Sequence, residues 1–185
     1  GNIELLRRVS SELGFTADEV PEVRLRGQRI SSSRIRQLLA EGRVNLARRM
    51  LGRPYGVEGR VVRGAERGRS LGFPTANIRP TNRVIPRGGV YVTATLIEGA
   101  WRRSVTNVGV RPTFESAGEP SVETFVMDWG GDLYGDVVRV RFLRRLRDER
   151  RFSSVAELKR QIEADAARAR KFFDRAGVRR SLSVI

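Results

Sequence analysis

The hydrophobic residues of this chain change their spacing near residue 53. Before that point, apolar residues recur at the spacing of an amphipathic helix. Gly14, Gly42 and Gly52 each follow one of these apolar stretches, at a position where glycine commonly ends a helix. We therefore predict that residues 1–52 are mostly helical.

From residue 55 the hydrophobic period becomes two, which is the alternation of half-buried strands. Stretches rich in Val, Thr and aromatic residues are separated by turn signals such as Glu98-Gly99. The predicted strands are residues 57–62, 89–97, 101–108, 122–129 and 137–143. Five or six strands without intervening helices favour an antiparallel barrel or sandwich.

The last predicted strand has one apolar face and one charged face. Val138, Val140 and Phe142 alternate with arginines, so we expect one side in the core and the other in water. A final helix is predicted after this strand, because Ser154 and Glu157 have the spacing of a capping box and an apolar stripe follows them. The expected fold is mainly β with a C-terminal helix.

The composition limits the chemistry that the chain can perform. Its 185 residues are enough for one main domain with a small appendage. Cysteine and histidine are absent, which excludes disulfides, Cys or His metal sites, a Ser-His-Asp triad and a Cys-His nucleophile pair. Since no lysine precedes Lys159, a P-loop and the strand lysine of a protein kinase are excluded as well. Any catalysis must use carboxylates, hydroxyls, amides, arginines or a bound hard cation.

The net charge of +15 is typical of a protein whose partners are polyanions, either nucleic acids or small phosphates. The arginines are spread along the whole chain, so we interpret most of them as a solvated surface. No apolar run is long enough to cross a membrane, and the first residues lack the form of a signal peptide. We expect a cytoplasmic protein without a membrane partner.

The stretch "GRSLGFPTAN" at residues 68–77 is a local candidate for a functional site. Glycines within residues 64–72 permit backbone amides to approach an anion closely. Thr75 and Asn77 follow Pro74 and would point the same way in an extended segment, where they offer neutral oxygens that suit Mg²⁺. These residues alone leave two interpretations open: a magnesium and phosphate site, or side chains that satisfy the loop backbone.

Several separate motifs resemble one known family. The segments are "GRVVRGAERGRSLGFPTANI", "GVY", "NVGVRPTF", "SVETFVMDWGGDLYG" and "LRDERRFSSVAELKRQIEADAARAR". In order and spacing they are similar to the riboflavin kinase module of the bifunctional bacterial riboflavin kinase/FAD synthetase, over about residues 53–173. The preceding "ISSSRIRQLLAEG" resembles the end of the adenylyltransferase module of the same family, with Ser33 where threonine is usual.

The resemblance implies a six-stranded antiparallel Greek-key barrel that transfers the γ-phosphate of ATP to the 5′-hydroxyl of riboflavin and so makes FMN. It implies that Thr75 and Asn77 hold Mg²⁺ and the phosphates of ATP. The loop expected to cover these phosphates contains three further candidates, Gly64, Gly68 and Arg69. The family therefore favours the magnesium and phosphate interpretation of residues 68–77.

On the flavin side, the resemblance implies a base and a closing segment. Glu123 in "SVETF" is expected to accept the proton of the ribityl hydroxyl. Arg147 and Phe152 in "LRDERRF" are expected to close over the flavin. Many family members have histidine where Phe125 stands, so a polar partner of the substrate is not expected at that position.

The resemblance also divides the chain into two parts. Residues 1–52 are expected to be a remnant of the adenylyltransferase module, and residues 53–185 the riboflavin kinase domain with its C-terminal helix. The first part lacks the histidine-containing nucleotide signature of the family. We therefore expect this chain to convert riboflavin and ATP to FMN but not to FAD.

A basic β-barrel that binds nucleic acid without catalysis is the alternative. The charge supports it, as does the use of small barrels for nucleic-acid binding. Aromatic residues make up only 7% of the chain, however, and they are not interleaved with arginines along one strand as a base-stacking surface requires. We therefore favour the kinase.

Overall fold

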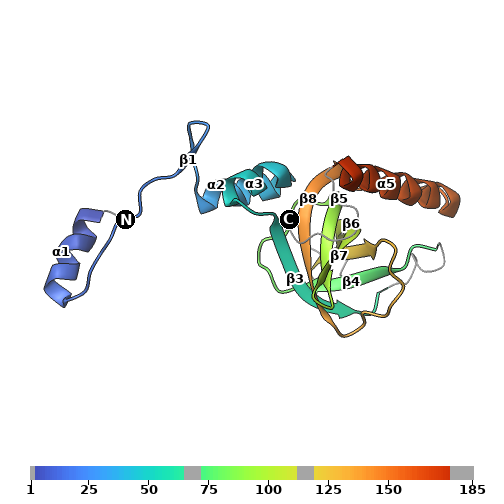
Figure 1. Cartoon of the computed structure of the whole chain (residues 1–185), viewed down its shortest axis with the longest axis horizontal. Coiled ribbons are helices and arrows are strands. Elements are labelled where there is room, and N and C mark those ends of the chain that lie inside the picture. Colours follow the sequence, from blue (N-terminus) through green and yellow to red (C-terminus); the bar gives the residue numbers. More distant parts are fainter. Residues whose placement is uncertain (1–2, 65–71, 112–118, 176–185) are drawn as a thin grey trace. The chain divides into compact units, whose positions relative to one another are not determined.

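The computed structural model describes residues 3–64, 72–111 and 119–175 (Figure 1). The chain forms two compact units, Gly1–Ser31 and Ser32–Ile185. Within the described ranges, no helix is both long enough and apolar enough to cross a membrane.

The first unit contains one helix and one small hairpin. Helix α1 (Ile3–Leu13) ends where the sequence predicts, ahead of Gly14, whose φ of 72° favours glycine. The hairpin pairs β1 (Arg24–Leu25) with β2 (Gln28–Arg29).

The second unit begins with two short helices, α2 (Ser32–Ala40) and α3 (Val44–Leu51). Gly42 and Gly52 follow them with φ values of 74° and 70°, so the predicted helix ends are confirmed. The apolar side chains of these helices are buried in the same cluster as residues of the barrel: Leu38, Leu39, Val44, Ala47, Val57 and Tyr91. The unit that holds the barrel therefore starts at Ser32.

Six antiparallel strands form the closed barrel, in the order β3-β4-β7-β6-β5-β8. The strands are β3 (Tyr55–Val62), β4 (Thr75–Pro80), β5 (Gly89–Ile97), β6 (Ala100–Arg111), β7 (Glu119–Val126) and β8 (Val137–Arg147). Because β5, β6 and β7 are consecutive neighbours and β8 returns to pair with β5, the arrangement is a Greek key. The expected fold class is confirmed (Figure 1).

The predicted strands correspond to five of the six, with ends shifted by a few residues. The strand missing from that set is β4, whose sequence Thr-Ala-Asn-Ile-Arg-Pro shows no regular alternation of apolar and polar residues. The alternation in β8 is confirmed, since Val138, Val140 and Phe142 are buried.

The barrel interior combines apolar side chains with hydrogen-bonded hydroxyls. Thr93 Oγ1 lies 2.8 Å from Ser104 Oγ and 2.7 Å from Thr106 Oγ1. The chain of bonds continues from Ser104 to Thr95 and from Thr106 to Thr124. All five residues are buried, so each hydroxyl has the partner that burial of a polar group requires.

Helix α5 (Val155–Arg175) covers part of the outer face of the barrel. Ala166, Ala169 and Phe173 on this helix pack against Val92 and Ala94 on β5. Apolar surface on the outside of the sheet is therefore removed from water, as it is on the inside.

The start of α5 has the predicted cap, with one difference. Ser154 Oγ accepts a hydrogen bond from the backbone N–H of Glu157 at 3.2 Å. The Glu157 carboxylate accepts its return bond from the backbone N–H of Ser153, at 3.0 Å, and not from Ser154. This backbone donor and the Ser153 hydroxyl lower the pKa of Glu157.

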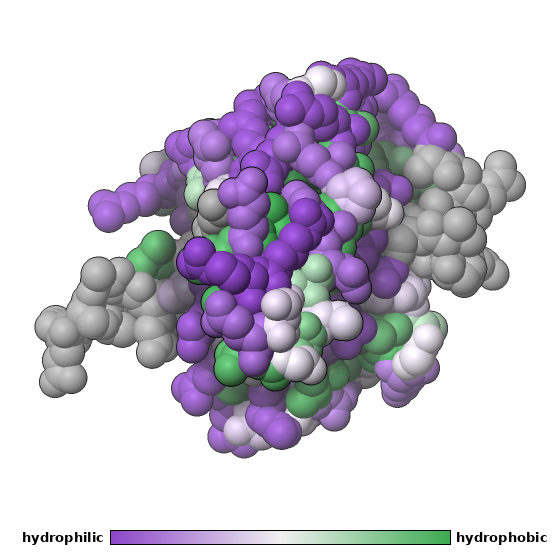
Figure 2. All heavy atoms as spheres, turned by 90° about the vertical axis from the view of Figure 1, so that its left-hand side faces the viewer, coloured by the Kyte–Doolittle hydropathy of each residue, from purple (hydrophilic) through white to green (hydrophobic). Residues whose placement is uncertain are grey.

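The molecular surface matches the charged composition. Figure 2 shows one face on which hydrophilic side chains predominate and hydrophobic ones gather in smaller groups between them. This appearance agrees with the interpretation of most arginines as solvated surface residues in a chain of net charge +15.

Candidate active site

One row of paired residues crosses five strands and contains three of the predicted site residues, Asn77, Glu123 and Arg147. Asn77 on β4 pairs with Glu123 on β7, which pairs in turn with Asn107 on β6. The row continues from Asn107 to Val90 on β5, and from Val90 to Arg147 on β8. Because neighbouring strands lie about 4.8 Å apart, the row extends over roughly 19 Å. Five motifs that are distant in the sequence therefore meet on one line of the barrel.

This row lies on the outer face of the barrel. Val90 shares its face of β5 with Val92 and Ala94, because side chains alternate along a strand. Both of these residues pack beneath α5. The row consequently runs along the outer surface of the sheet that α5 partly covers.

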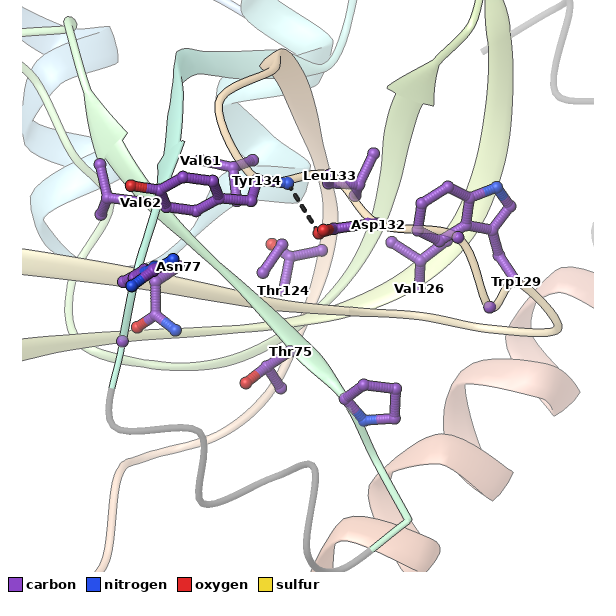
Figure 3. A pocket seen from close by; sticks show the side chains of 16 residues that line it. Val61, Val62, Thr75, Asn77, Thr124, Val126, Trp129, Asp132, Leu133 and Tyr134 are labelled. Atoms are coloured by element: carbon purple, nitrogen blue, oxygen red, sulfur yellow. Dashed lines mark hydrogen bonds between the residues drawn. The ribbon is translucent and has the colours of Figure 1, made fainter.

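A first cavity, of about 560 Å³, lies between the end of β3, the start of β4 and the segment after β7. Thr75 and Asn77 contribute to its wall, and Figure 3 shows both side chains projecting from β4. Trp129 and Tyr134 supply aromatic surface, and Asp132 Oδ1 accepts a hydrogen bond from the backbone N–H of Tyr134 at 3.0 Å (Figure 3). The cavity thus combines aromatic surface with neutral oxygen-bearing side chains.

Gly64 fixes the position of Asn77 in this cavity. A Cβ atom added to Gly64 would lie 2.0 Å from Asn77 Nδ2 and 2.2 Å from Asn77 Cγ, which is far inside van der Waals contact. Asn77 is only 5% exposed, so neighbouring atoms cover most of its side chain. Glycine is therefore required at residue 64 for steric reasons.

A second cavity, of about 240 Å³, lies between the outer face of the sheet and α5. Glu123, Asn107 and Arg147 of the row line it, as does Phe152. Thr75 lines both cavities. A group bound in one cavity and a group bound in the other would therefore meet beside this threonine.

A buried ion pair holds Arg147 at the edge of the second cavity. Asp165 on α5 is 2% exposed, and its Oδ2 accepts from Arg147 Nε at 2.9 Å and lies 2.8 Å from Nη2. Its Oδ1 accepts from Gln161 Nε2 at 3.0 Å, and Arg147 Nη1 also donates to the backbone oxygen of Asp148. The guanidinium is consequently fixed to α5 and to its own loop together.

Phe152, which lines the second cavity, has two arginines near its ring. The Arg150 guanidinium carbon is 4.7 Å from the centre of its ring, and that of Arg147 is 5.8 Å away. Phe125 and Phe73, which also line this cavity, meet edge to face with ring centres 5.2 Å apart. Phe125 therefore gives this cavity an aromatic wall.

The structure brings together the predicted residues that it describes. Gly64, Thr75 and Asn77 line the first cavity, and Thr75, Glu123, Arg147 and Phe152 line the second. Gly68 and Arg69 fall outside the described residues. The described part of the chain contains no cluster of three or more acidic, histidine or cysteine side chains that could hold a metal.

Sequence reasoning missed four residues of these cavities that the structure places there. They are Asn107, Asp132, Glu149 and Asp165. Each of the four lies in a motif that carries the family resemblance, and this membership is the sequence feature that could have identified it. Their contacts arise only when distant strands and α5 come together.

Residues 51–173 of this chain match the model of the family described as "Flavokinase: Riboflavin kinase". The bifunctional riboflavin kinase/FMN adenylyltransferase of Pseudomonas fluorescens is 41% identical over 170 residues, covering 92% of this chain and 55% of that protein. The protein of the same name from Escherichia coli K12 is 40% identical over 174 residues, covering 94% of this chain and 55% of that protein. The chain thus spans about half the length of these curated relatives.

A solved structure supports the fold. The crystal structure described as a macrolide-efflux protein from Streptococcus pneumoniae is 39% identical, with a TM-score of 0.77, and covers 82% of this chain and 50% of that chain. Its likeness to this chain extends over most of the second unit. The fold and cavities define a small antiparallel β-barrel with a candidate ligand site beside its C-terminal helix. The chain belongs to the riboflavin kinase family.

Replacing Arg147 by methionine should lower the free energy of unfolding by about 3 kcal/mol, because the buried Asp165 carboxylate loses its cation. Adding Asp165→Leu to that variant should recover most of the loss, since no unpaired charge then remains. Urea denaturation at neutral pH measures both effects.

The matched control is Arg139→Met, because Arg139 pairs with Glu58 at 2.6 Å on the exposed surface, with side chains 51% and 44% accessible. Its cost should be below about 1 kcal/mol. Equal losses in Arg147→Met and Arg139→Met would show that burial of Asp165 does not govern the effect.

Proposed function

We propose that this protein is a riboflavin kinase that uses ATP and Mg²⁺ to phosphorylate the 5′-hydroxyl of riboflavin, giving FMN and ADP in the cytoplasm. The observation that carries the proposal is the pair of cavities that share Thr75. A phosphate donor in one and an alcohol in the other would meet at that residue. The names of the relatives that match most of the chain agree with this reaction.

The first cavity suits the nucleotide. Its volume of about 560 Å³ is within the range of small-molecule sites, and its aromatic residues Trp129 and Tyr134 could contact a base. Gly64 brings the backbone close to Asn77, as a phosphate-covering loop requires. Gly68 and Arg69 complete this loop in the proposal.

The side chains of Thr75 and Asn77 would hold Mg²⁺. A hydroxyl and an amide oxygen are hard, neutral ligands, and this ion takes its other ligands from water and substrate phosphates. Gly64 packs so closely against Asn77 that a side chain at residue 64 would collide with the Asn77 amide. The Gly64 backbone therefore holds this amide in place on one side. When bound, the ion neutralises charge on the phosphates.

Glu123 would act as the base. It pairs across the strands with Asn77, and directly opposed side chains have Cβ atoms about 5 Å apart. A hydroxyl that donates a hydrogen bond to Glu123 from the second cavity therefore lies close to the phosphate end of the site. Phosphoryl transfer needs mainly such in-line positioning, and the carboxylate takes the hydroxyl proton as the new bond forms.

The second cavity suits the flavin. Phe125, Phe152, Leu158 and Ile162 give it an apolar lining for a flat aromatic ring, and Glu123 lies in its wall toward β4. Arg147 is held by Asp165 at the α5 side. The hydroxyl chain of riboflavin would therefore run toward Glu123 while the ring remains under α5.

The direct test is to incubate the protein with riboflavin, ATP and MgCl₂ and to separate the products by chromatography. FMN without FAD is the expected outcome, and removal of Mg²⁺ by a chelator should abolish it. Unchanged riboflavin in the complete mixture would contradict the proposal. Tight binding of a single-stranded oligonucleotide with a steep salt dependence would then favour the nucleic-acid alternative.

Glu123→Gln should reduce the rate of FMN formation by a factor of about 10² to 10⁴, because the base is lost while size and polarity are kept. Binding of Mg-ATP, measured by calorimetry, should remain unchanged. Glu163→Gln, an exposed position on α5, is the control. Wild-type turnover in Glu123→Gln would remove this carboxylate from the mechanism.

Gly64→Ala should raise the KM for Mg-ATP about tenfold, which corresponds to about 1.4 kcal/mol, because the new methyl group displaces Asn77. Riboflavin affinity should be unaffected. Gly130→Ala is a matched control, since Gly130 lines the same cavity and a Cβ there meets no atom within 4 Å. The steric explanation requires that the two variants differ; equal KM values would rule it out.

A further inference from the structure

Asn107 lies beside two carboxylates of the second cavity, those of Glu123 and Glu149. The proposed reaction gives a role to Glu123 but none to Asn107 or Glu149. Asn107 is the cross-strand partner of Glu123. Its Nδ2 also donates a hydrogen bond to Glu149 Oε1 at 3.0 Å, although the two residues are 42 positions apart. All three side chains line the cavity of about 240 Å³.

The backbone leaves space for the Glu149 carboxylate. A Cβ at Gly109 would lie 2.4 Å from Glu149 Oε1, and a Cβ at Gly88 would lie 3.4 Å from Oε2. A side chain at residue 109 would therefore drive the carboxylate away from Asn107. The position of Glu149 depends on a glycine of β6 as well as on its hydrogen bond.

The neighbouring acids have cations, whereas Glu149 has none among the residues that the structure describes. Asp148 is bound by Arg145 at 2.7 Å, which lowers the pKa of Asp148, and Asp165 is bound by Arg147. Among the residues that the structure describes, the Asn107 amide is the one hydrogen-bond partner of Glu149, which has no ion pair there. In a chain of net charge +15, this carboxylate still has capacity to accept hydrogen bonds.

The chemistry of the pair fixes the orientation of Asn107. An ionised carboxylate only accepts hydrogen bonds, so the amide must turn its NH₂ group to Glu149. Asn107 Oδ1 then faces away from Glu149 as an acceptor. Together with Glu123, the cavity wall presents a series of acceptors, which complements an uncharged ligand with several adjacent hydroxyl donors.

We infer that Asn107 and Glu149 bind the secondary hydroxyls of the ribityl chain and set its position along the row, so that the terminal hydroxyl reaches Glu123. This inference rests on the proposed function and makes the pair determinants of specificity for a polyol chain. The ring beneath α5 does not depend on the pair. Flavins with and without the polyol should therefore respond differently to its removal.

The test compares two ligands in the full chain, riboflavin and lumiflavin, which carries a methyl group in place of the ribityl chain. Dissociation constants come from the change in flavin fluorescence. Glu149→Ala should weaken riboflavin binding about tenfold or more, the effect of losing a hydrogen bond to a charged group, and should leave lumiflavin binding unchanged. Glu149 is exposed, so the variant should keep its unfolding midpoint, and Glu163→Ala is the control.

Equal weakening of both flavins by Glu149→Ala, or no weakening of riboflavin, would overturn the inference while FMN formation by the wild type still supports the kinase. A wild-type protein that binds neither flavin and forms no FMN would overturn the proposed function itself, and this inference with it. The ratio of the two dissociation constants is thus a readout that a purely structural role of Glu149 would not change.

Discussion

The site depends on the pairing of β4 with β7. Four residues of β4, from Thr75 to Ile78, pair with residues 122–125 of β7, and this short ladder sets Asn77 beside Glu123. Because side chains alternate along a strand, a slip of one residue would turn Thr75 and Asn77 toward the barrel interior. Both cavities would lose their shared wall. The register of this six-residue strand therefore controls which groups can meet in the site.

The interior of the barrel aligns β7 with the next two strands, β6 and β5. The chain of hydroxyls from Thr95 to Thr124 links β5, β6 and β7, and each bond connects neighbouring strands. Hydrogen bonds have directional requirements that apolar contacts lack, so they specify one alignment of these strands. Tyr91 and Phe142, in edge-to-face contact, fill the adjacent volume. The part of the row on β5, β6 and β7 is thus aligned by contacts on the inner face.

The change of hydrophobic period was sufficient to predict a mainly β fold with helices at its ends, and the family resemblance was needed to choose a closed six-stranded barrel over a sandwich. It did not predict β4, whose short mixed sequence has neither period. The motifs selected Thr75, Asn77 and Glu123 as candidates, but a motif does not show which contacts its residues make. The bond between Asn107 and Glu149 joins residues far apart in the chain, and it exists only because Gly109 leaves space for it. Such a contact depends on register and packing, which a single sequence does not display.

The distribution of charge explains how a strongly basic chain can contain a carboxylate site. Arginines pair with structural acids such as Asp165 and Glu58, whereas Glu123 and Glu149 have no ion pair among the described residues. At long range the excess positive charge attracts an anionic nucleotide. At short range an arginine beside a catalytic carboxylate would favour its ionised form and weaken its attraction for a hydroxyl proton. In the proposed reaction the excess positive charge would attract ATP, while Glu123, which has no ion pair among the described residues, would be available to the hydroxyl of the alcohol.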